Sequence, residues 1–391
     1  MKKHTKHAKL QRRTNGVYAP FELSILGVKC SIITNLVKDV AKRLHKNYSI
    51  GYLDAYHSDT AVAPVFNTYT FHHSGSLAMK AAANLNKYSE RIRFSEHDLT
   101  FVNGNHFPGK KQILILDREK ENSVYKRLKQ IDNIQFIIKT DVGMPVFDFI
   151  LQKYPEVADV PTYHINDLDS ITNHIEKLLI RNRPTLNGLV LAGGKSTRMG
   201  KDKGMLDYHG MPQREFLVEL LEQGLAFSEQ QQLLANPELE NQQLIGKVYL
   251  SLRENNEDLN YSIIPDKFID LGPFGAICSA FMNNPNEAYL VVATDLPYVD
   301  EKLIQLLIEK RNPKKMATAI KGKDNEFPEP LITIWEPKAY PVLLSYLAQG
   351  FSCPRKALIN SDVELVEVDT DLIHNVNTPT EFEQAKENLK K

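Results

Sequence analysis

The start of the second half of the chain combines two adjacent glycines with cationic side chains, as a bound polyphosphate requires. Gly193 and Gly194 follow an apolar stretch at 186–191. Without a Cβ they let the backbone approach a ligand, so that successive N–H groups can face phosphate oxygens. Arg198 and Lys203 add a forked and a mobile cationic donor beside this turn. The spacing predicts a phosphate-binding loop, and the alternative is a glycine turn with a solvated basic flank.

Two aspartates come directly after predicted strands. Asp295 follows the apolar run 288–293, and Asp266 follows Pro265. Ligands of open α/β sheets bind at the carboxyl ends of the strands, so both carboxylates are expected at that edge. Asp295 offers the hard oxygen ligand that Mg²⁺ prefers beside nucleotide phosphates. The structural alternatives are a cap on the turn before Pro297 for Asp295 and a plain turn residue for Asp266.

Asn375 and Asn377 alternate along a short segment near the carboxyl terminus. In an extended backbone their side chains would point to the same side and could hydrogen-bond one ligand. The residues that follow, Thr378 and Pro379 with Glu381, also have the pattern of a helix start. A binding role and a structural role therefore both remain open for this segment.

Residues 191–203, Leu-Ala-Gly-Gly-Lys-Ser-Thr-Arg-Met-Gly-Lys-Asp-Lys, resemble the signature of nucleotidyltransferases of the molybdenum cofactor guanylyltransferase (MobA) type. Further segments resemble that family's motifs in the same order, at 264–266, 272–275, 291–297 and 374–379. Together these motifs cover residues 186–384. The resemblance implies that residues 185–391 form a Rossmann-like nucleotidyltransferase domain.

The resemblance also implies a reaction, in which the terminal phosphate of molybdopterin attacks the α-phosphate of GTP. Pyrophosphate leaves and molybdopterin guanine dinucleotide forms. A phosphate monoester is already a nucleophile, so catalysis consists of in-line positioning and charge neutralisation. The implied cofactor is Mg²⁺, with Asp295 as its ligand. The implied catalytic residues are Arg198, Lys203 and Asp295.

The same resemblance implies contacts to both substrates. Leu191, Ala192 and Gly193 would line the guanine side, Asp266 would contact the nucleotide, and the segment of Asn375 and Asn377 would hold the pterin. One position departs from the family, because Ser251, followed by Arg253, stands where an asparagine can occur after the second strand. A serine can still donate and accept one hydrogen bond. The implied binding residues are Leu191, Ala192, Gly193, Gly194, Lys203, Ser251, Asp266, Asn375 and Asn377.

Two other functions remain open from the sequence. The first is a nucleotidyltransferase with another donor or acceptor, such as a cytidylyltransferase for the same cofactor or a sugar-phosphate enzyme. The second is a non-catalytic protein that delivers the pterin to molybdoenzymes, which the intact Gly193, Gly194, Arg198, Lys203 and Asp295 disfavour. The expected partners are GTP and molybdopterin. Molybdoenzymes, their chaperones and other cofactor-biosynthesis proteins are further candidates, and nucleic acid and membranes are not expected.

The first half of the chain contains an altered phosphate-loop frame. Residues 27–34 have the spacing GxxxxGK[ST], but Ile32 and Ile33 replace the second glycine and the lysine that reaches the phosphates. The segments 100–104, 111–116 and 160–167 resemble MobB, the GTP-binding partner of the guanylyltransferase. We therefore predict that residues 21–184 form a degenerate MobB-like domain with a P-loop-like fold and no nucleotide hydrolysis. The chain would then be a fusion protein.

Strand and helix patterns alternate in both halves, as expected for two α/β domains, each with a mainly parallel sheet flanked by helices. Pro184 ends the last helix of the first half and marks the boundary. Residues 226–246, rich in Gln and Glu, are predicted to be a surface insertion. Helices are predicted at 35–44 and 168–180, and strands at 21–27, 48–53, 112–116, 136–139, 187–192, 247–252, 261–264, 288–293, 315–320, 331–335 and 364–368.

The composition is consistent with two α/β domains and excludes several other classes of protein. A length of 391 residues suits two domains. The 48 basic and 48 acidic residues balance, which excludes a chain built mainly to coat nucleic acid or an anionic membrane. The basic residues 1–20 are predicted to be a disordered tail, with an anion-binding arm as the alternative. We expect neither a signal peptide nor a membrane span.

The cysteines point to a compartment. Cys30, Cys278 and Cys353 are far apart in sequence and form no CxxC pair. Such a set cannot build a disulfide framework, which fits a reducing environment. We therefore expect a cytoplasmic protein whose three cysteines are small buried residues.

Overall fold

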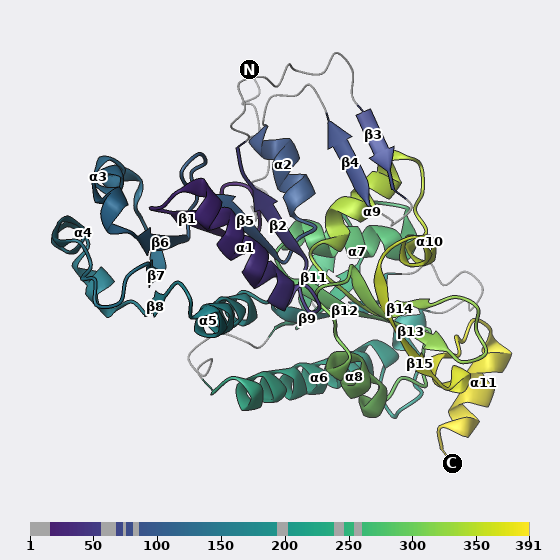
Figure 1. Ribbon diagram of the computed structural model, residues 1–391. Helices are drawn as coiled ribbons and strands as arrows, with labels where there is room; N and C mark the ends of the chain where they lie inside the picture. Colours follow the sequence, from purple (N-terminus) through teal and green to yellow (C-terminus); the bar gives the residue numbers. More distant parts are fainter. Residues whose placement is uncertain are drawn as a thin grey trace, which may run out of the picture. The chain divides into compact units, whose positions relative to one another are not determined.

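A computed structural model of the protein describes residues 16–55, 68–72, 76–80, 86–193, 202–237, 246–253 and 260–390. Most of the predicted basic tail, Gly194 and Arg198 lie outside the described residues. The chain divides into two compact units whose boundary lies between Asn182 and Arg183 (Figure 1). Each unit is described by itself.

The sheet of the first unit is parallel throughout the part that the structure describes. Apolar runs account for its central strands, which are buried on both faces, as parallel strands between two helical layers must be. In order across the sheet, its strands are β2 (Ile50–Leu53), β5 (Leu99–Asn103), β1 (Glu22–Leu26), β6 (Gln112–Leu116), β7 (Ile134–Lys139) and β8 (Thr162–His164).

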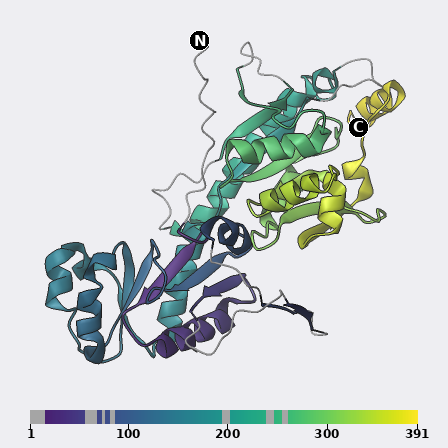
Figure 2. The same ribbon diagram turned by 90° about the horizontal axis from the view of Figure 1, so that it is seen from above.

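Helices cover both faces of this sheet (Figures 1 and 2). Ile113 and Ile115 of β6 belong to the core beneath α1 (Cys30–Leu44) and α5 (Leu168–Arg181). The alternate residues of the same strand pack beneath α3 (Glu121–Lys126) and α4 (Asp148–Lys153) on the other face. The unit also contains α2 (Lys87–Phe94), a hairpin of β3 (Thr68–Phe71) and β4 (Leu77–Lys80), and the 3₁₀ turns η1 (Arg118–Lys120), η2 (Leu128–Gln130) and η3 (Pro155–Asp159).

The second unit has a mixed sheet in which one strand opposes the others. β14 is antiparallel to both of its neighbours, β12 and β13. The remaining pairs in the described residues are parallel. The order across this sheet is β11 (Ser262–Pro265), β10 (Val248–Leu252), β9 (Leu186–Leu191), β12 (Ala288–Ala293), β14 (Glu329–Trp335), β13 (Ala317–Gly322) and β15 (Val363–Val368).

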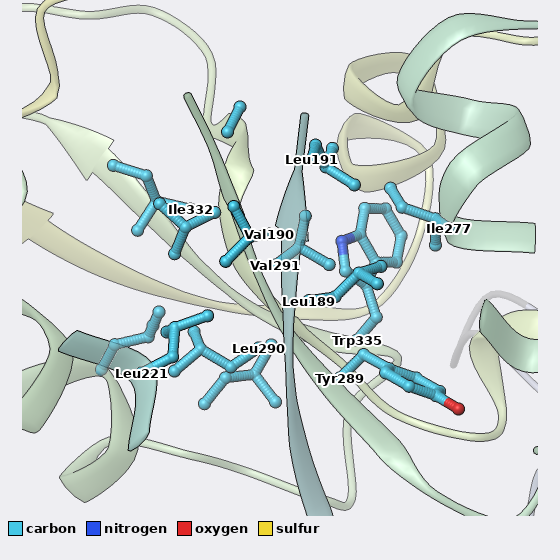
Figure 3. Packing of buried hydrophobic residues seen from close by; sticks show 14 of the residues in the cluster. Leu189, Val190, Leu191, Leu221, Ile277, Tyr289, Leu290, Val291, Ile332 and Trp335 are labelled. Atoms are coloured by element: carbon cyan, nitrogen blue, oxygen red, sulfur yellow. The ribbon is translucent and has the colours of Figure 1, made fainter. Parts of the chain in front are cut away.

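Alternating side chains of β9, β12 and β14 fill two layers of core. Val190 and Ile332 point toward Leu221 of α6, whereas Leu189 and Trp335 point toward Ile277 of α7 (Figure 3). Helices α6 (Gln213–Ala235) and α8 (Glu301–Glu309) pack together, as do α7 (Gly272–Asn283), α9 (Ala339–Ala348) and α10 (Pro354–Ile359). The unit also contains the 3₁₀ turns η4 (Lys203–Met205) and η6 (Thr370–Ile373), and it ends in α11 (Pro379–Asn388).

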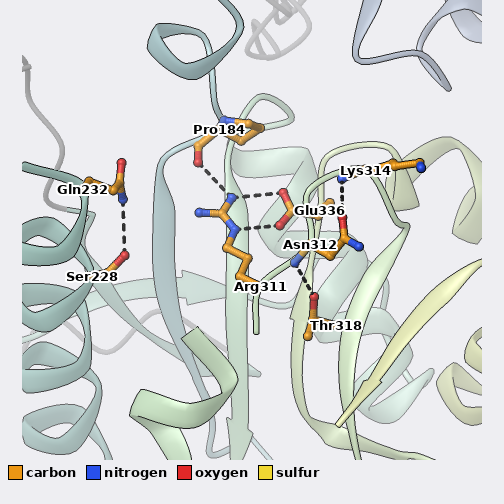
Figure 4. A network of polar contacts seen from close by, with 8 residues as sticks. All are labelled: Pro184, Ser228, Gln232, Arg311, Asn312, Lys314, Thr318 and Glu336. Atoms are coloured by element: carbon orange, nitrogen blue, oxygen red, sulfur yellow. Dashed lines mark hydrogen bonds and ion pairs between the residues drawn. The ribbon is translucent and has the colours of Figure 1, made fainter. Parts of the chain in front are cut away.

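A buried ion pair connects the start of the second unit to its core. Arg311 and Glu336 form a two-pronged pair at 2.7 and 3.0 Å, with side chains only 5% and 1% exposed. Arg311 also donates to the carbonyl oxygen of Pro184 at 2.9 Å, just before β9 begins (Figure 4). The guanidinium therefore satisfies a buried carboxylate and one orphan backbone acceptor together.

The predicted fold class is confirmed, because both units are α/β with mainly parallel sheets flanked by helices. The predicted insertion at 226–246 is wrong in its first half, where the residues continue α6 to Ala235. Gln and Glu are good helix formers, and the buried Ser228 and Leu225 hold this part of the helix to the core. Of the three cysteines, Cys278 is buried as expected, whereas Cys30 is partly exposed and Cys353 is exposed. Among the described residues, no helix is long and apolar enough to cross a bilayer.

Candidate active site

The predicted phosphate turn begins where β9 reaches the edge of its sheet. Ala192 donates its N–H to the carbonyl oxygen of Ser251 on β10 at 3.1 Å. A Cβ on Gly193 would lie 3.2 Å from the backbone nitrogen of Arg253, closer than most side chains tolerate. Glycine therefore allows β9 to leave the sheet against the end of β10. The rest of the predicted turn, with Gly194 and Arg198, lies outside the described residues.

Lys203 joins three segments that are far apart in sequence. It begins the turn η4, which Asp202 caps by accepting the N–H of Gly204 at 2.9 Å. Its Nζ donates to Oδ1 of Asn377 at 2.8 Å and to the carbonyl oxygen of Val376 at 3.0 Å. It also lies 3.7 Å from Oδ2 of Asp295. Three residues predicted from separate motifs, Lys203, Asp295 and Asn377, are thus in direct contact.

Asp295 lies just beyond the end of β12 and is mostly buried. Its carbonyl oxygen accepts the N–H of Val376 at 2.8 Å, which fixes the carboxyl-terminal segment beside it. Burial raises the pKa of the carboxyl group, and the Lys203 ammonium opposes that rise. Within the described part of the chain, Oδ1 of Asp295 is buried without a hydrogen-bond partner. A buried oxygen in this state is suited to a ligand or a cation.

Asp266 and Ser251 form a second group at the ends of β11 and β10. Ser251 is almost fully buried, and its hydroxyl lies 3.4 Å from Oδ1 of Asp266. The backbone N–H of Asp266 donates to Leu252 at 2.9 Å. Burial raises the pKa of Asp266, and the Ser251 hydroxyl and the Arg253 charge lower it. The predicted contacts Leu191, Ala192 and Gly193 lie between this group and the Lys203 group, because β9 lies between β10 and β12.

The helix start predicted in the segment 375–381 is confirmed, whereas the binding role of Asn375 and Asn377 stays a prediction. Thr378 caps α11 and forms a capping box with Glu381. The Glu381 carboxylate also accepts the N–H of Asn377 at 2.6 Å. Asn377 therefore sits at a braced helix start and still presents its side chain to Lys203. Asn375 is half-buried in the same extended segment.

Sequence reasoning missed Glu329, the first residue of β14. In the antiparallel register Val292 pairs with Ile332, so the start of β14 approaches the end of β12. Burial raises the pKa of Glu329, and the Asp295 carboxylate raises it further. No motif marked this residue. The only available signal was a charged residue at the start of an apolar strand.

Burial of Asp295 leads to a prediction about stability. A carboxyl group whose pKa is raised in the folded protein ionises more readily in the unfolded chain. Its cost to stability therefore grows as pH rises from the unfolded-state pKa of about 3.9 to the raised folded-state pKa. Asp295→Asn should therefore raise the Tm of the second unit at about pH 8, and this gain should disappear near about pH 4. The chain has one tryptophan, the fully buried Trp335, whose fluorescence reports on this unit. A lower Tm for the variant at the higher pH would mean that attraction to Lys203 outweighs burial.

The altered phosphate-loop frame of the first unit is largely helical. β1 ends at Leu26 and α1 begins at Cys30, so little of the frame remains as loop. Ile33, in the frame of the missing lysine, is fully buried in the core. The Thr34 hydroxyl lies 3.2 Å from the Tyr52 hydroxyl and donates to Asp54 at 3.3 Å. Because α1 begins so early, no loop of P-loop length remains between β1 and α1. The Thr34 hydroxyl, which a P-loop would use for Mg²⁺, is engaged by Tyr52 and Asp54.

We therefore expect Thr34→Ala to leave GTP binding by the full chain unchanged. The expected result of calorimetry with Mg²⁺ and GTP is one binding site per chain, with the same Kd in both proteins. Lys203→Ala serves as the comparison, because it should weaken that one site. A second, magnesium-dependent site that Thr34→Ala abolishes would show that the altered frame still binds nucleotide.

Known proteins are similar to the two halves of the chain. Residues 188–363 match the family described as "MobA-like NTP transferase domain". The molybdenum cofactor biosynthesis bifunctional protein of Synechocystis sp. is 31% identical over 200 residues, which are 51% of this chain and 53% of that protein. The chain thus spans about half the length of this relative.

Two further proteins are similar to parts of the chain. A probable molybdenum cofactor guanylyltransferase of Flavobacterium johnsoniae is 29% identical over 161 residues, 41% of this chain and 74% of the relative. In the amino-terminal part, the chain is similar to the crystal structure of Bacillus subtilis MobB, with 17% identity and a TM-score of 0.29. That alignment covers 39% of this chain and 96% of the MobB chain.

Proposed function

We propose, from the MobA-like NTP transferase domain in its carboxyl-terminal half, that this protein transfers GMP from GTP to molybdopterin. The relatives named as a cofactor biosynthesis protein and a guanylyltransferase support this choice of donor and acceptor. An oxygen of the terminal phosphate of molybdopterin forms a bond to the α-phosphorus of GTP. The bond from that phosphorus to the bridging oxygen of the β-phosphate breaks, and pyrophosphate leaves.

The observation that carries the proposal is the contact between Lys203, Asp295 and Asn377. These residues come from three separate motifs, and the fold brings a cation, a buried carboxylate and an amide together at the carboxyl edge of β9 and β12. Ligands of α/β sheets bind at this edge. In the proposed reaction Lys203 neutralises charge on the donor phosphates. Asn377 orients the Lys203 ammonium through its Oδ1.

We also propose that Mg²⁺ is the cofactor and that Asp295 is its protein ligand. The unpartnered Oδ1 of Asp295 fits this role, as does the preference of Mg²⁺ for one or two carboxylates plus substrate phosphates. No cluster of three or more acidic, histidine or cysteine ligands occurs among the described residues, so the phosphates would complete the coordination. When bound, the ion would supply positive charge to the triphosphate.

A donor screen tests the proposal. GTP, CTP, ATP and UTP are each incubated with the full chain, molybdopterin and Mg²⁺, and pyrophosphate release is measured. We expect kcat/KM to be highest for GTP. Equal or greater kcat/KM for CTP would contradict the guanylyl assignment, and release with none of the four donors would contradict transfer itself.

The reducing cytoplasm is the proposed setting of the protein, in line with its three free cysteines.

A further inference from the structure

Glu329 is a buried carboxylate beside the proposed site, and its charge is balanced by an arginine. Its side chain is 9% exposed. Oε1 accepts the N–H of Leu331 at 3.1 Å, and Oε2 accepts from Nη2 of Arg355 at 3.2 Å. Burial raises the pKa of Glu329; the Leu331 N–H and Arg355 lower it, and Asp295 raises it. Glu329 therefore interacts electrostatically with Asp295 and holds the Arg355 guanidinium through its Oε2.

Arg355 differs from the buried arginine of the same unit. Arg311 is 5% exposed and grips its carboxylate with two prongs, as a structural ion pair does. The Arg355 side chain is 47% exposed and meets Glu329 through a single nitrogen. A guanidinium has five N–H donors in a fixed plane. Arg355 is thus anchored at one point by a buried anion, with much of its donor surface toward solvent.

The strand order separates the proposed binding sites of the two substrates. The predicted guanine and nucleotide contacts, Gly193 and Asp266, follow β9 and β11 on one side of β12. Glu329 begins β14 on the other side of β12, at the same edge, because β14 runs antiparallel. Asp295 lies between them. A donor bound over β9 to β11 leaves the β14 side for the acceptor.

The reaction itself requires a cation on that side. An attacking phosphate monoester and the α-phosphate of a nucleotide are both anions, so their approach is repulsive unless positive charge is placed between or beside them. Lys203 is engaged with Asp295 and Asn377 and serves the donor. Arg355 is a cation on the acceptor side, and its planar fork matches a phosphate group.

We propose that Arg355 binds the terminal phosphate of the acceptor, and that Glu329 is the positioning residue that holds its guanidinium. The inference rests on the proposed function and names the residue that recognises the anionic end of its second substrate. Neither Arg355 nor Glu329 belongs to a predicted motif.

The test separates acceptor binding from donor binding. Binding of molybdopterin to the full chain is measured by titration, and the KM values for GTP and for molybdopterin are measured by pyrophosphate release. Arg355→Ala should weaken molybdopterin binding and raise its KM by about 10- to 100-fold. Its KM for GTP should stay within about twofold of the wild-type value. Arg355→Lys should recover only part of the loss, because an ammonium lacks the fork.

Three controls keep the result interpretable. Lys356→Ala removes the neighbouring cation, which lies over the Phe351 ring, and should change neither KM. Arg355→Ala combined with Glu329→Gln removes the buried charge that the single variant leaves unpaired, so a folding defect is relieved while the binding defect persists. Dephosphorylated molybdopterin should bind equally to the wild type and to Arg355→Ala.

The outcomes distinguish the inference from the proposed function. Unchanged molybdopterin binding by Arg355→Ala, or an equal rise in both KM values, would overturn the role of Arg355 even if GMP transfer continues. A wild-type protein that binds molybdopterin through Arg355 but releases no pyrophosphate would overturn the transferase proposal and support the phosphate contact. A loss of binding that also affects the dephosphorylated pterin would overturn the phosphate contact.

Discussion

Replacing Asp295 by alanine is expected to lower kcat for pyrophosphate release by about 10²- to 10³-fold while the fold is retained. The carboxylate lies at the sheet edge next to Lys203 and outside the hydrophobic core cluster of this unit. Its Oδ1 has no hydrogen-bond partner among the described residues, so alanine removes neither a core side chain nor a hydrogen bond of that oxygen. Lys203→Ala should have an effect of similar size, since it removes the cation that contacts both Asp295 and Asn377. Steady-state rates and Trp335 fluorescence measure activity and folding on the same samples.

The double variant sharpens this prediction. If Lys203 and Asp295 act as one unit, the double alanine variant should lose little more activity than either single variant. Asp369→Ala is a matched control, because Asp369 is 74% exposed and pairs with Lys323 at 2.7 Å on the surface. Near wild-type release by either site variant would remove both residues from the site.

Arg311→Ala is expected to destabilise the second unit by about 3–5 kcal/mol, because it leaves the Glu336 carboxylate buried without its charge partner. The variant also orphans the Pro184 carbonyl oxygen before β9. Urea unfolding followed by Trp335 fluorescence measures the loss, and Trp335 directly precedes Glu336 in the chain. The urea midpoint should fall sharply.

Two further variants show whether the unpaired charge is the cause. Arg311→Met with Glu336→Leu removes both charges and should recover much of the lost stability. Lys323→Ala breaks an exposed pair and should leave the urea midpoint nearly unchanged. A similarly small loss for Arg311→Ala would mean that water reaches Glu336 and that the pair is not an anchor.

Local patterns sufficed for most of the fold. The predicted strands of the second unit lie within about two residues of β9 to β15, because each is an apolar run bounded by turn residues. The antiparallel direction of β14 could not be predicted, since strand direction depends on the path of the chain between strands. The end of α6 was missed because polar residues with good helix propensity resemble a surface loop in composition.

The residues of the site likewise divide into those that sequence motifs predicted and those that they did not. Lys203, Asp295 and Asn377 were predicted from motifs, and the structure brings them into contact. Glu329 and Arg355 were not predicted, because their position depends on the register of β14 with β12 and on the packing of α10 against β14. A sequence pattern records spacing along the chain. Glu329 approaches Asp295 only through the register of β14 with β12, and Arg355 is held there only through its contact with Glu329.

The proposed function of this chain is to join GMP to molybdopterin. The most direct measurement is mass spectrometry of the pterin product after incubation of the full chain with molybdopterin, Mg²⁺ and GTP labelled in its α-phosphate. We expect a dinucleotide that carries the label in a pyrophosphate linkage, formed together with an equal amount of free pyrophosphate and absent with Asp295→Ala. Unmodified molybdopterin, or label recovered only as free GMP, would contradict it.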